Sequence, residues 1–97
     1  MREGQSSPWG RIQYVREMGP GAWAVSTAGH GGVKLDRGRN AKVPKTARHP
    51  GGWYEEDCDV AIALYVHPDI STADRADLLR SIKSWQSPAV QQALGVA

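Results

Sequence analysis

Apolar and polar positions alternate over residues 11–18 and again over residues 22–27. A period of two is the pattern of a half-buried β-strand. The two segments are separated by Gly-Pro-Gly at residues 19–21, which is strong turn punctuation, so together they predict a β-hairpin. The glycine-rich residues 28–32 interrupt the pattern, and the apolar–basic–apolar residues 33–35 then predict a short third strand.

Helical spacing replaces alternation in the second half of the chain. Residues 53–68 contain a run of carboxylates, then alanines and an almost continuous apolar segment, and they end at a proline. Acidic residues complement the positive end of a helix, so this segment predicts a central helix with Glu55 in its first turn. A buried strand over residues 60–66 is the alternative, because several of these residues are β-branched. Capping residues and apolar spacing predict two further helices within residues 71–85 and 87–95.

Strands that precede helices imply an α+β fold. We expect a small antiparallel sheet of about three strands, including the N-terminal hairpin, packed against two or three C-terminal helices. Residues 36–52 are expected to be mostly loop, with one or two helical turns capped by Asp36. Residues 1–8 are polar and contain glycine, serine and proline, so we expect a flexible N-terminus followed by a single domain over residues 9–97.

Composition limits the class of protein. The chain has 97 residues, four tryptophans and one cysteine, Cys58, so it cannot form an internal disulfide. The tryptophans are spread through the sequence, and we expect each of them to anchor its segment in a shared core. The N-terminus has no apolar run typical of a signal peptide, and the longest apolar run, residues 60–66, is far shorter than the ~20 residues of a membrane span. We therefore expect a cytoplasmic protein, in the host cell if the chain comes from a virus or mobile element.

The charges are separated along the chain, although the formal net charge is only +2. Carboxylates gather within residues 55–59, directly after a block that contains basic residues and no acidic ones. Such a basic block suits a phosphate group or an acidic protein surface; the alternative is a solvated loop. The candidate partner-binding residues are Arg37, Arg39, Lys42, Lys45 and Arg48.

His30, which lies among three glycines, is the candidate for acid–base chemistry. If its loop meets the start of the central helix, the imidazole can pair with Glu55 or Glu56. The favoured alternative is a structural hydrogen bond that joins the loop to the helix. The loop lacks the phosphate-binding glycine motifs and is not accompanied by a nucleophile elbow. We expect its glycines to permit a chain reversal, because glycine tolerates positive φ.

Neither metal binding nor sequence-specific DNA binding is expected. The three histidines and Cys58 lack the paired spacing of metal ligands, and no other cofactor motif occurs. The basic block contains no aromatic residue of the kind that single-strand binding uses for stacking. The last predicted helix carries no basic side chain and would make a poor recognition helix.

Three sequence blocks occur in a specific order: Pro-Trp-Gly at 8–10, Val-Ser-Thr-Ala-Gly-His-Gly-Gly-Val-Lys-Leu at 25–35, and Gly-Gly-Trp-Tyr-Glu-Glu-Asp at 51–57. They resemble an uncharacterised domain of phage, prophage, plasmid and bacterial proteins, over about residues 8–68. The resemblance implies a genomic setting and no established activity.

A free-standing domain of this size and setting is similar to anti-CRISPR proteins, which usually bind a CRISPR effector and block it. The expectation is a small phage- or mobile-element-encoded binding protein, without enzymatic activity, that occludes a host protein complex, with a type I CRISPR effector as the partner. The alternatives are an enzyme that uses His30 with Glu55 or Glu56, and an accessory domain of a phage or plasmid system.

Overall fold

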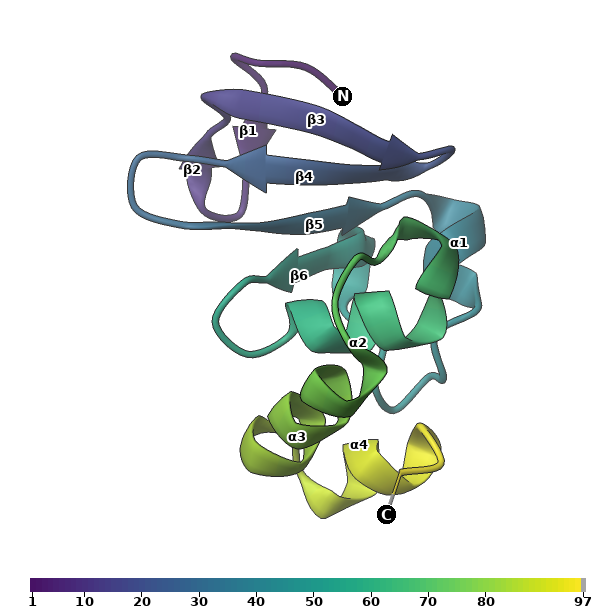
Figure 1. Ribbon diagram of the computed structural model, residues 1–97. Coiled ribbons are helices and arrows are strands. Elements are labelled where there is room, and N and C mark those ends of the chain that lie inside the picture. Colours follow the sequence, from purple (N-terminus) through teal and green to yellow (C-terminus); the bar gives the residue numbers. More distant parts are fainter. Residues whose placement is uncertain (97) are drawn as a thin grey trace.

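The main sheet is built from strands that pair with their neighbours in sequence. The computed structural model describes residues 1–96, and Figure 1 shows a sheet at one end and helices toward the other. The sheet is antiparallel, has the order β3-β4-β5-β6, and consists of β3 (Tyr14–Gly19), β4 (Ala22–Ser26), β5 (Gly31–Leu35) and β6 (Trp53–Glu55). A separate hairpin pairs β1 (Ser6–Ser7) with β2 (Gly10–Arg11).

Most of the helical structure follows the last strand. The described part of the chain contains α1 (Arg37–Ala41), α2 (Val60–Val66), α3 (Arg75–Trp85) and α4 (Pro88–Ala93), with 3-10 turns at Pro50–Gly52 and Pro68–Ile70. Asp36 caps α1 as expected, because its carboxylate accepts a hydrogen bond of 2.8 Å from the Arg39 N–H. None of the helices formed by residues 1–96 is long and apolar enough to cross a membrane.

The structure confirms the α+β class but adds a strand that the pattern analysis assigned to a helix. Residues 53–55 form β6, and α2 begins only at Val60. Glu55 therefore lies in a strand, and the expectation that it occupies the first turn of a helix is wrong. The reason is tertiary: Tyr54 pairs with Val33 at the edge of the sheet and is fully buried there. The burial of this aromatic side chain outweighs the local preference for helix.

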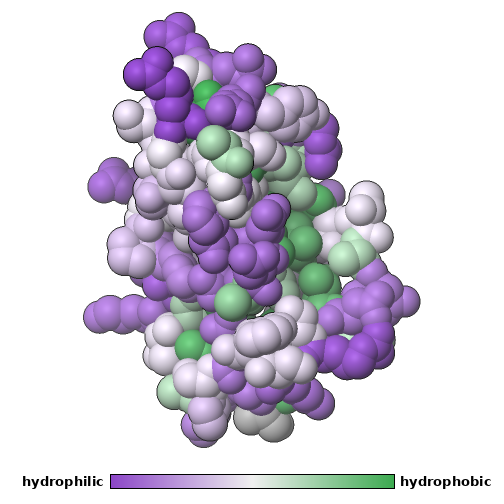
Figure 2. Space-filling model, turned by 90° about the vertical axis from the view of Figure 1, so that its left-hand side faces the viewer, coloured by the Kyte–Doolittle hydropathy of each residue, from purple (hydrophilic) through white to green (hydrophobic). Residues whose placement is uncertain are grey.

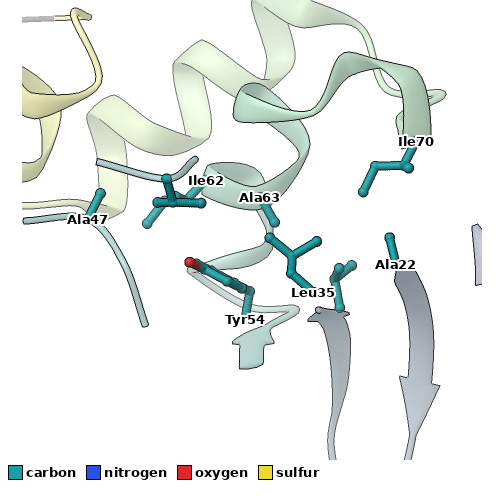
Figure 3. Close-up of a cluster of buried hydrophobic side chains, with 9 residues drawn as sticks. Ala22, Leu35, Ala47, Tyr54, Ile62, Ala63 and Ile70 are labelled. Atoms are coloured by element: carbon teal, nitrogen blue, oxygen red, sulfur yellow. The ribbon is translucent and has the colours of Figure 1, made fainter. Parts of the chain in front are cut away.

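The core lies between one face of the sheet and α2. The register pairs Ala22 with Leu35 and Val33 with Tyr54, so these side chains share a face. Figure 3 shows how side chains of the strands and of α2 meet in this cluster, with the Tyr54 ring lying among them. A smaller cluster joins α2 to the C-terminal helices, and it contains Ala61, Leu78, Ile82 and Val96.

None of the four tryptophans is buried in this core, contrary to expectation. Trp9, Trp23 and Trp53 are half-buried, and Trp85 is 66% exposed at the end of α3. Tyrosine and small or branched aliphatic residues fill the core instead. All four tryptophans therefore contribute to the surface of the protein.

The N-terminal segment, expected to be flexible, contributes a hairpin. Gly4 donates a backbone hydrogen bond to Ile12 at 2.8 Å, and Ile12 donates one to Gln5 at 2.9 Å. Ile12 is buried, which ties the base of this hairpin to the domain. The hairpin brings Trp9 against Gly32 of β5, on the sheet face opposite the core. The two faces of the sheet are thus covered by different parts of the chain.

Candidate functional site

The loop between β4 and β5 holds His30 in a closed turn. The Thr27 N–H donates to the His30 carbonyl at 2.8 Å. The Thr27 hydroxyl accepts from the His30 N–H at 3.2 Å and lies 3.1 Å from the His30 carbonyl. A single threonine side chain therefore fixes the backbone of His30 at the start of β5. In Figure 1 this loop projects at the left edge of the sheet.

The structure brings His30 and Glu55 together, as the sequence hypothesis requires. His30 Nδ1 lies 3.4 Å from Glu55 Oε2, and the imidazole is 55% exposed. The pairing of Gly32 with Glu55 across β5 and β6 produces this contact. Glu56 is exposed, and its N–H donates to the Gly31 carbonyl at 2.9 Å. The imidazole thus joins the β4–β5 loop to the strand β6, and not to a helix.

The glycines of this loop provide space and not positive φ. Gly29, Gly31 and Gly32 all have ordinary φ values, so the expected left-handed reversal is wrong. At residue 32 a Cβ atom would overlap the Tyr54 carbonyl oxygen and lie 2.7 Å from Cη2 of Trp9. Gly32 therefore allows β6 on one side and the Trp9 ring on the other to approach the backbone of β5.

Two tryptophans meet at right angles beside these glycines. The ring centroids of Trp9 and Trp53 are 5.5 Å apart, with an interplanar angle of 82°. The Lys34 ammonium lies 4.7 Å from the Trp53 centroid, at a distance typical of a cation–π interaction. Residues from all three sequence blocks thus converge on this face of the sheet, although they are separated by more than 40 positions in the chain.

A second histidine–carboxylate pair lies next to the first. His49 Nε2 is 3.6 Å from Asp59 Oδ1, and the Gln86 side-chain amide donates to the same oxygen at 3.0 Å. His49 also packs against the Tyr54 ring, with centroids 4.9 Å apart. Sequence analysis missed this pair, because nothing in the spacing of a loop histidine and a distant carboxylate predicts that they meet.

The second pair lines a surface cavity of about 310 Å³, which we call the tryptophan cavity. Its walls are Pro8, Trp9, His49, Pro50, Trp53, Glu55 and Asp59. Flat rings and prolines thus border an open surface space that two carboxylate residues also line. Figure 2 shows the side of the molecule that carries the β4–β5 loop: hydrophilic residues cover most of it, and hydrophobic ones gather along one edge.

The residues of the basic block have two different roles. Arg39 is engaged inside the protein: its guanidinium donates to Asp69 at 2.7 and 3.0 Å and to the Pro20 carbonyl at 2.6 Å. Its Nη1 also lies 3.3 Å from Nδ1 of the buried His67. The other four are exposed and make no ion pair within residues 1–96; they are Arg37, Lys42, Lys45 and Arg48, and we call them the basic surface.

Part of the basic surface borders a second cavity, of about 490 Å³, which we call the basic cavity. Lys34, Arg37 and Arg48 supply its cations, and Asp36 its only carboxylate among the described lining residues. Burial lowers the pKa of Lys34, an effect that nearby Asp36 opposes. Lys34 also donates a hydrogen bond to the Gly51 carbonyl. Sequence analysis did not identify Lys34, because it precedes the basic block and lies in a strand.

Nucleophilic and metal-assisted chemistry receive no support from the described residues. Burial, together with Asp59, Asp57 and Glu55, raises the pKa of the Cys58 thiol, so the unreactive protonated form is favoured. No group of three or more histidine, cysteine, aspartate or glutamate side chains within residues 1–96 is arranged to hold a metal ion.

The Arg39–Asp69 pair leads to a prediction on pH dependence. The hydrogen bonds from Arg39 lower the pKa of Asp69 in the folded protein. A lowered folded pKa stabilises the protein above the unfolded pKa of about 4, and this contribution is lost as pH falls through the folded value. We therefore expect Asp69→Asn to destabilise the protein at neutral pH and to flatten the acid branch of its stability curve. Urea unfolding at neutral and acidic pH measures the free energy of unfolding of this variant. The control is Asp57→Asn, at an exposed carboxylate. The same dependence of stability on pH in the two variants would contradict the prediction.

Comparison with known proteins identifies a family without assigning an activity. No curated protein and no solved structure matches the chain. One family model matches residues 2–97, which is almost the whole chain, and it is described as a domain of unknown function, DUF7007. The tryptophans, histidines and basic residues described above all lie within this match. The chain belongs to the DUF7007 family.

Proposed function

We propose that the chain is a binding protein that docks on a negatively charged surface of a larger assembly. The observation that carries this proposal is the basic surface: four exposed cations on α1 and the loop that follows it, which form no ion pair with any carboxylate in residues 1–96. Unpaired cations keep their charge available to a partner, and electrostatic complementarity speeds association and selects among partners.

The backbone that carries these cations is held in place. Asp36 caps α1, and Arg48 donates hydrogen bonds to the carbonyls of Val43 and Ala41 at 3.0 and 3.1 Å. Val43 and Ala47 are buried in the main core, so the loop after α1 is anchored at both points. A preformed surface loses less conformational entropy on binding than a mobile loop does. The fold therefore favours recognition by a rigid basic surface.

As the partner we propose a host defence assembly, specifically a type I CRISPR effector complex that the protein would block by occlusion. The small size of the chain, its resemblance to phage and plasmid domains and its exposed positive charge support this proposal. A positive surface does not imitate the charge of DNA, which argues against occupation of a DNA channel. We therefore propose an acidic face of an effector subunit as the docking site.

Removal of three of the exposed charges tests the proposal. We expect the triple variant Arg37→Ala, Lys42→Ala, Lys45→Ala to bind the purified effector complex about tenfold more weakly and with a smaller dependence on salt. Arg48 is kept, because it also holds the loop. The matched control is Arg2→Ala, Arg11→Ala, Lys83→Ala, which removes three exposed positive charges elsewhere and should bind as the unmodified protein does. Absence of binding by the unmodified protein, or an equal loss in both triple variants, would refute the proposal.

A second candidate function is acid–base catalysis by His30 and Glu55. The separation of 3.4 Å between His30 Nδ1 and Glu55 Oε2 favours it, because an orienting carboxylate is what a general base needs. The exposure of the imidazole leaves it accessible to a substrate. His30→Gln separates the two functions: it leaves both binding and inhibition intact if the protein acts by occlusion, and abolishes inhibition without loss of binding if the protein acts by catalysis.

A further inference from the structure

The basic cavity and the tryptophan cavity are neighbours. They flank the segment from Arg48 to Trp53, whose residues contribute to both of them. Lys34 lines the basic cavity and places its ammonium 4.7 Å from the ring of Trp53, which lines the tryptophan cavity. The contact between Lys34 and Trp53 therefore lies where the cationic space adjoins the aromatic space.

The basic cavity has the donors that an anion needs. Arg48 uses Nε and Nη2 for backbone carbonyls, and among the described residues its Nη1 has no partner and the exposed Arg37 makes no ion pair. Lys34 uses one of its three protons on the Gly51 carbonyl. Asp36 opposes an anion, but its Oδ1 is engaged by the Arg39 N–H at the start of α1. A phosphate group there would also favour the charged form of the partly desolvated Lys34.

The tryptophan cavity has the features that a nucleobase needs. The indole rings and prolines offer flat apolar walls, against which the faces of a base pack favourably. Glu55 and Asp59 also line this cavity and are only partly exposed; one oxygen of each faces a histidine, and the second oxygen of each remains as an acceptor for a base. Carboxylates accept hydrogen bonds from exocyclic amino groups. Guanine presents a ring N–H beside an amino group, whereas uracil presents one N–H between two carbonyls that a carboxylate repels.

We propose that the two cavities together bind a nucleotide, with the phosphate in the basic cavity and an amino-bearing base, guanine above all, in the tryptophan cavity. A free nucleoside monophosphate and the terminal nucleotide of a single strand offer the same chemistry. The basic block contains no aromatic residue in sequence, but the fold places Trp53 beside Lys34 and so supplies the combination of cations and rings. This inference goes beyond docking on an effector, although Arg37 and Arg48 take part in both.

Calorimetric titration of the whole chain tests the nucleotide site. We expect guanosine monophosphate to bind about tenfold more tightly than uridine monophosphate, which reflects one carboxylate–base contact. Guanosine alone and ribose 5-phosphate alone should each bind more weakly than the complete nucleotide. Short single strands that end in guanosine or uridine distinguish the sources: tighter binding of the strand indicates a nucleic-acid end, and equal binding indicates the free nucleotide. No binding of any guanosine-containing probe, or equal binding of the guanosine and uridine compounds, would overturn the proposal.

Substitutions in each cavity test which cavity binds the phosphate and which binds the base. Glu55→Gln should weaken the binding of guanosine monophosphate about tenfold and change the binding of uridine monophosphate little. Glu56→Gln, at the exposed neighbouring carboxylate, should change neither affinity. Arg37→Ala should weaken the binding of ribose 5-phosphate and leave the binding of guanosine unchanged. The double variant Lys42→Ala, Lys45→Ala should weaken binding to the effector complex and leave nucleotide binding unchanged, because neither residue lines the basic or the tryptophan cavity. Equal effects of Glu55→Gln and Glu56→Gln would refute the assignment.

Discussion

Gly32→Ala is expected to lower the free energy of unfolding by about 3 kcal/mol, the upper part of the range for overpacking. The new Cβ atom would overlap the carbonyl oxygen of Tyr54 and lie 3.0 Å from Cα of Glu55, both on β6. These are backbone atoms of the neighbouring strand, so the clash cannot be relieved by rotation of a side chain. The strands must separate, and the Trp9 ring on the other side must move.

Chemical denaturation of Gly32→Ala and Gly29→Ala measures this effect against a matched control. Gly29 lies in the same loop region with ordinary φ, and a Cβ atom there would meet no atom within 4 Å. We expect its substitution to change stability by less than about 0.5 kcal/mol. Similar stability of the two variants would show that close approach at Gly32 is not what the fold requires.

Tyr54→Phe is expected to cost about 1–3 kcal/mol, although the volume of the core hardly changes. The Tyr54 hydroxyl donates to Asn40 Oδ1 at 2.6 Å and accepts from the His49 N–H at 3.2 Å. Removal of the hydroxyl leaves both partners without this hydrogen bond. Burial raises the pKa of Tyr54, so the hydroxyl remains protonated and keeps its role as donor.

The same substitution at Tyr14 is the control, because Tyr14 is 51% exposed. Urea unfolding should show Tyr14→Phe within about 0.5 kcal/mol of the unmodified protein. If Tyr54→Phe is as stable as Tyr14→Phe, the hydroxyl does not hold the loop that carries His49. A Tyr54→Phe variant that also loses nucleotide binding would link this core residue to the shape of the tryptophan cavity.

The hairpin of β3 and β4 and the next strand, β5, could be predicted because their signals are local. Alternation, a Gly-Pro-Gly turn and a glycine-rich break all act within a few residues. Residues 53–55 could not be assigned in the same way, because three residues carry too little pattern. What makes them a strand is the pairing of Tyr54 with Val33, twenty-one positions earlier. The carboxylates after Tyr54 favoured a helix start, and the edge of the sheet overrode that preference.

The candidate site was predictable only where neighbouring strands create it. His30 and Glu55 meet because β5, which begins just after His30, pairs with β6, which ends at Glu55. A histidine and a glutamate are residue types that suggest an acid–base pair. His49 lies in a loop and Asp59 in a turn, and no strand pairing predicts from the sequence that they meet. The tryptophans were expected inside because of their size. The place of Trp9 depends on the glycine at residue 32, which admits the Trp9 ring against the backbone.

The sequential strand order has a consequence for how the chain folds during synthesis. Each strand of the main sheet after β3 pairs with the strand made immediately before it. A strand that leaves the ribosome therefore finds its partner already present, and within the main sheet only the edge of β5 waits for a more distant segment, Trp53–Glu55. α2, which completes the main core, follows all four strands. The last helices pack against α2 and arrive after the sheet is paired, and Gln86 at the end of α3 then holds Asp59 of the tryptophan cavity.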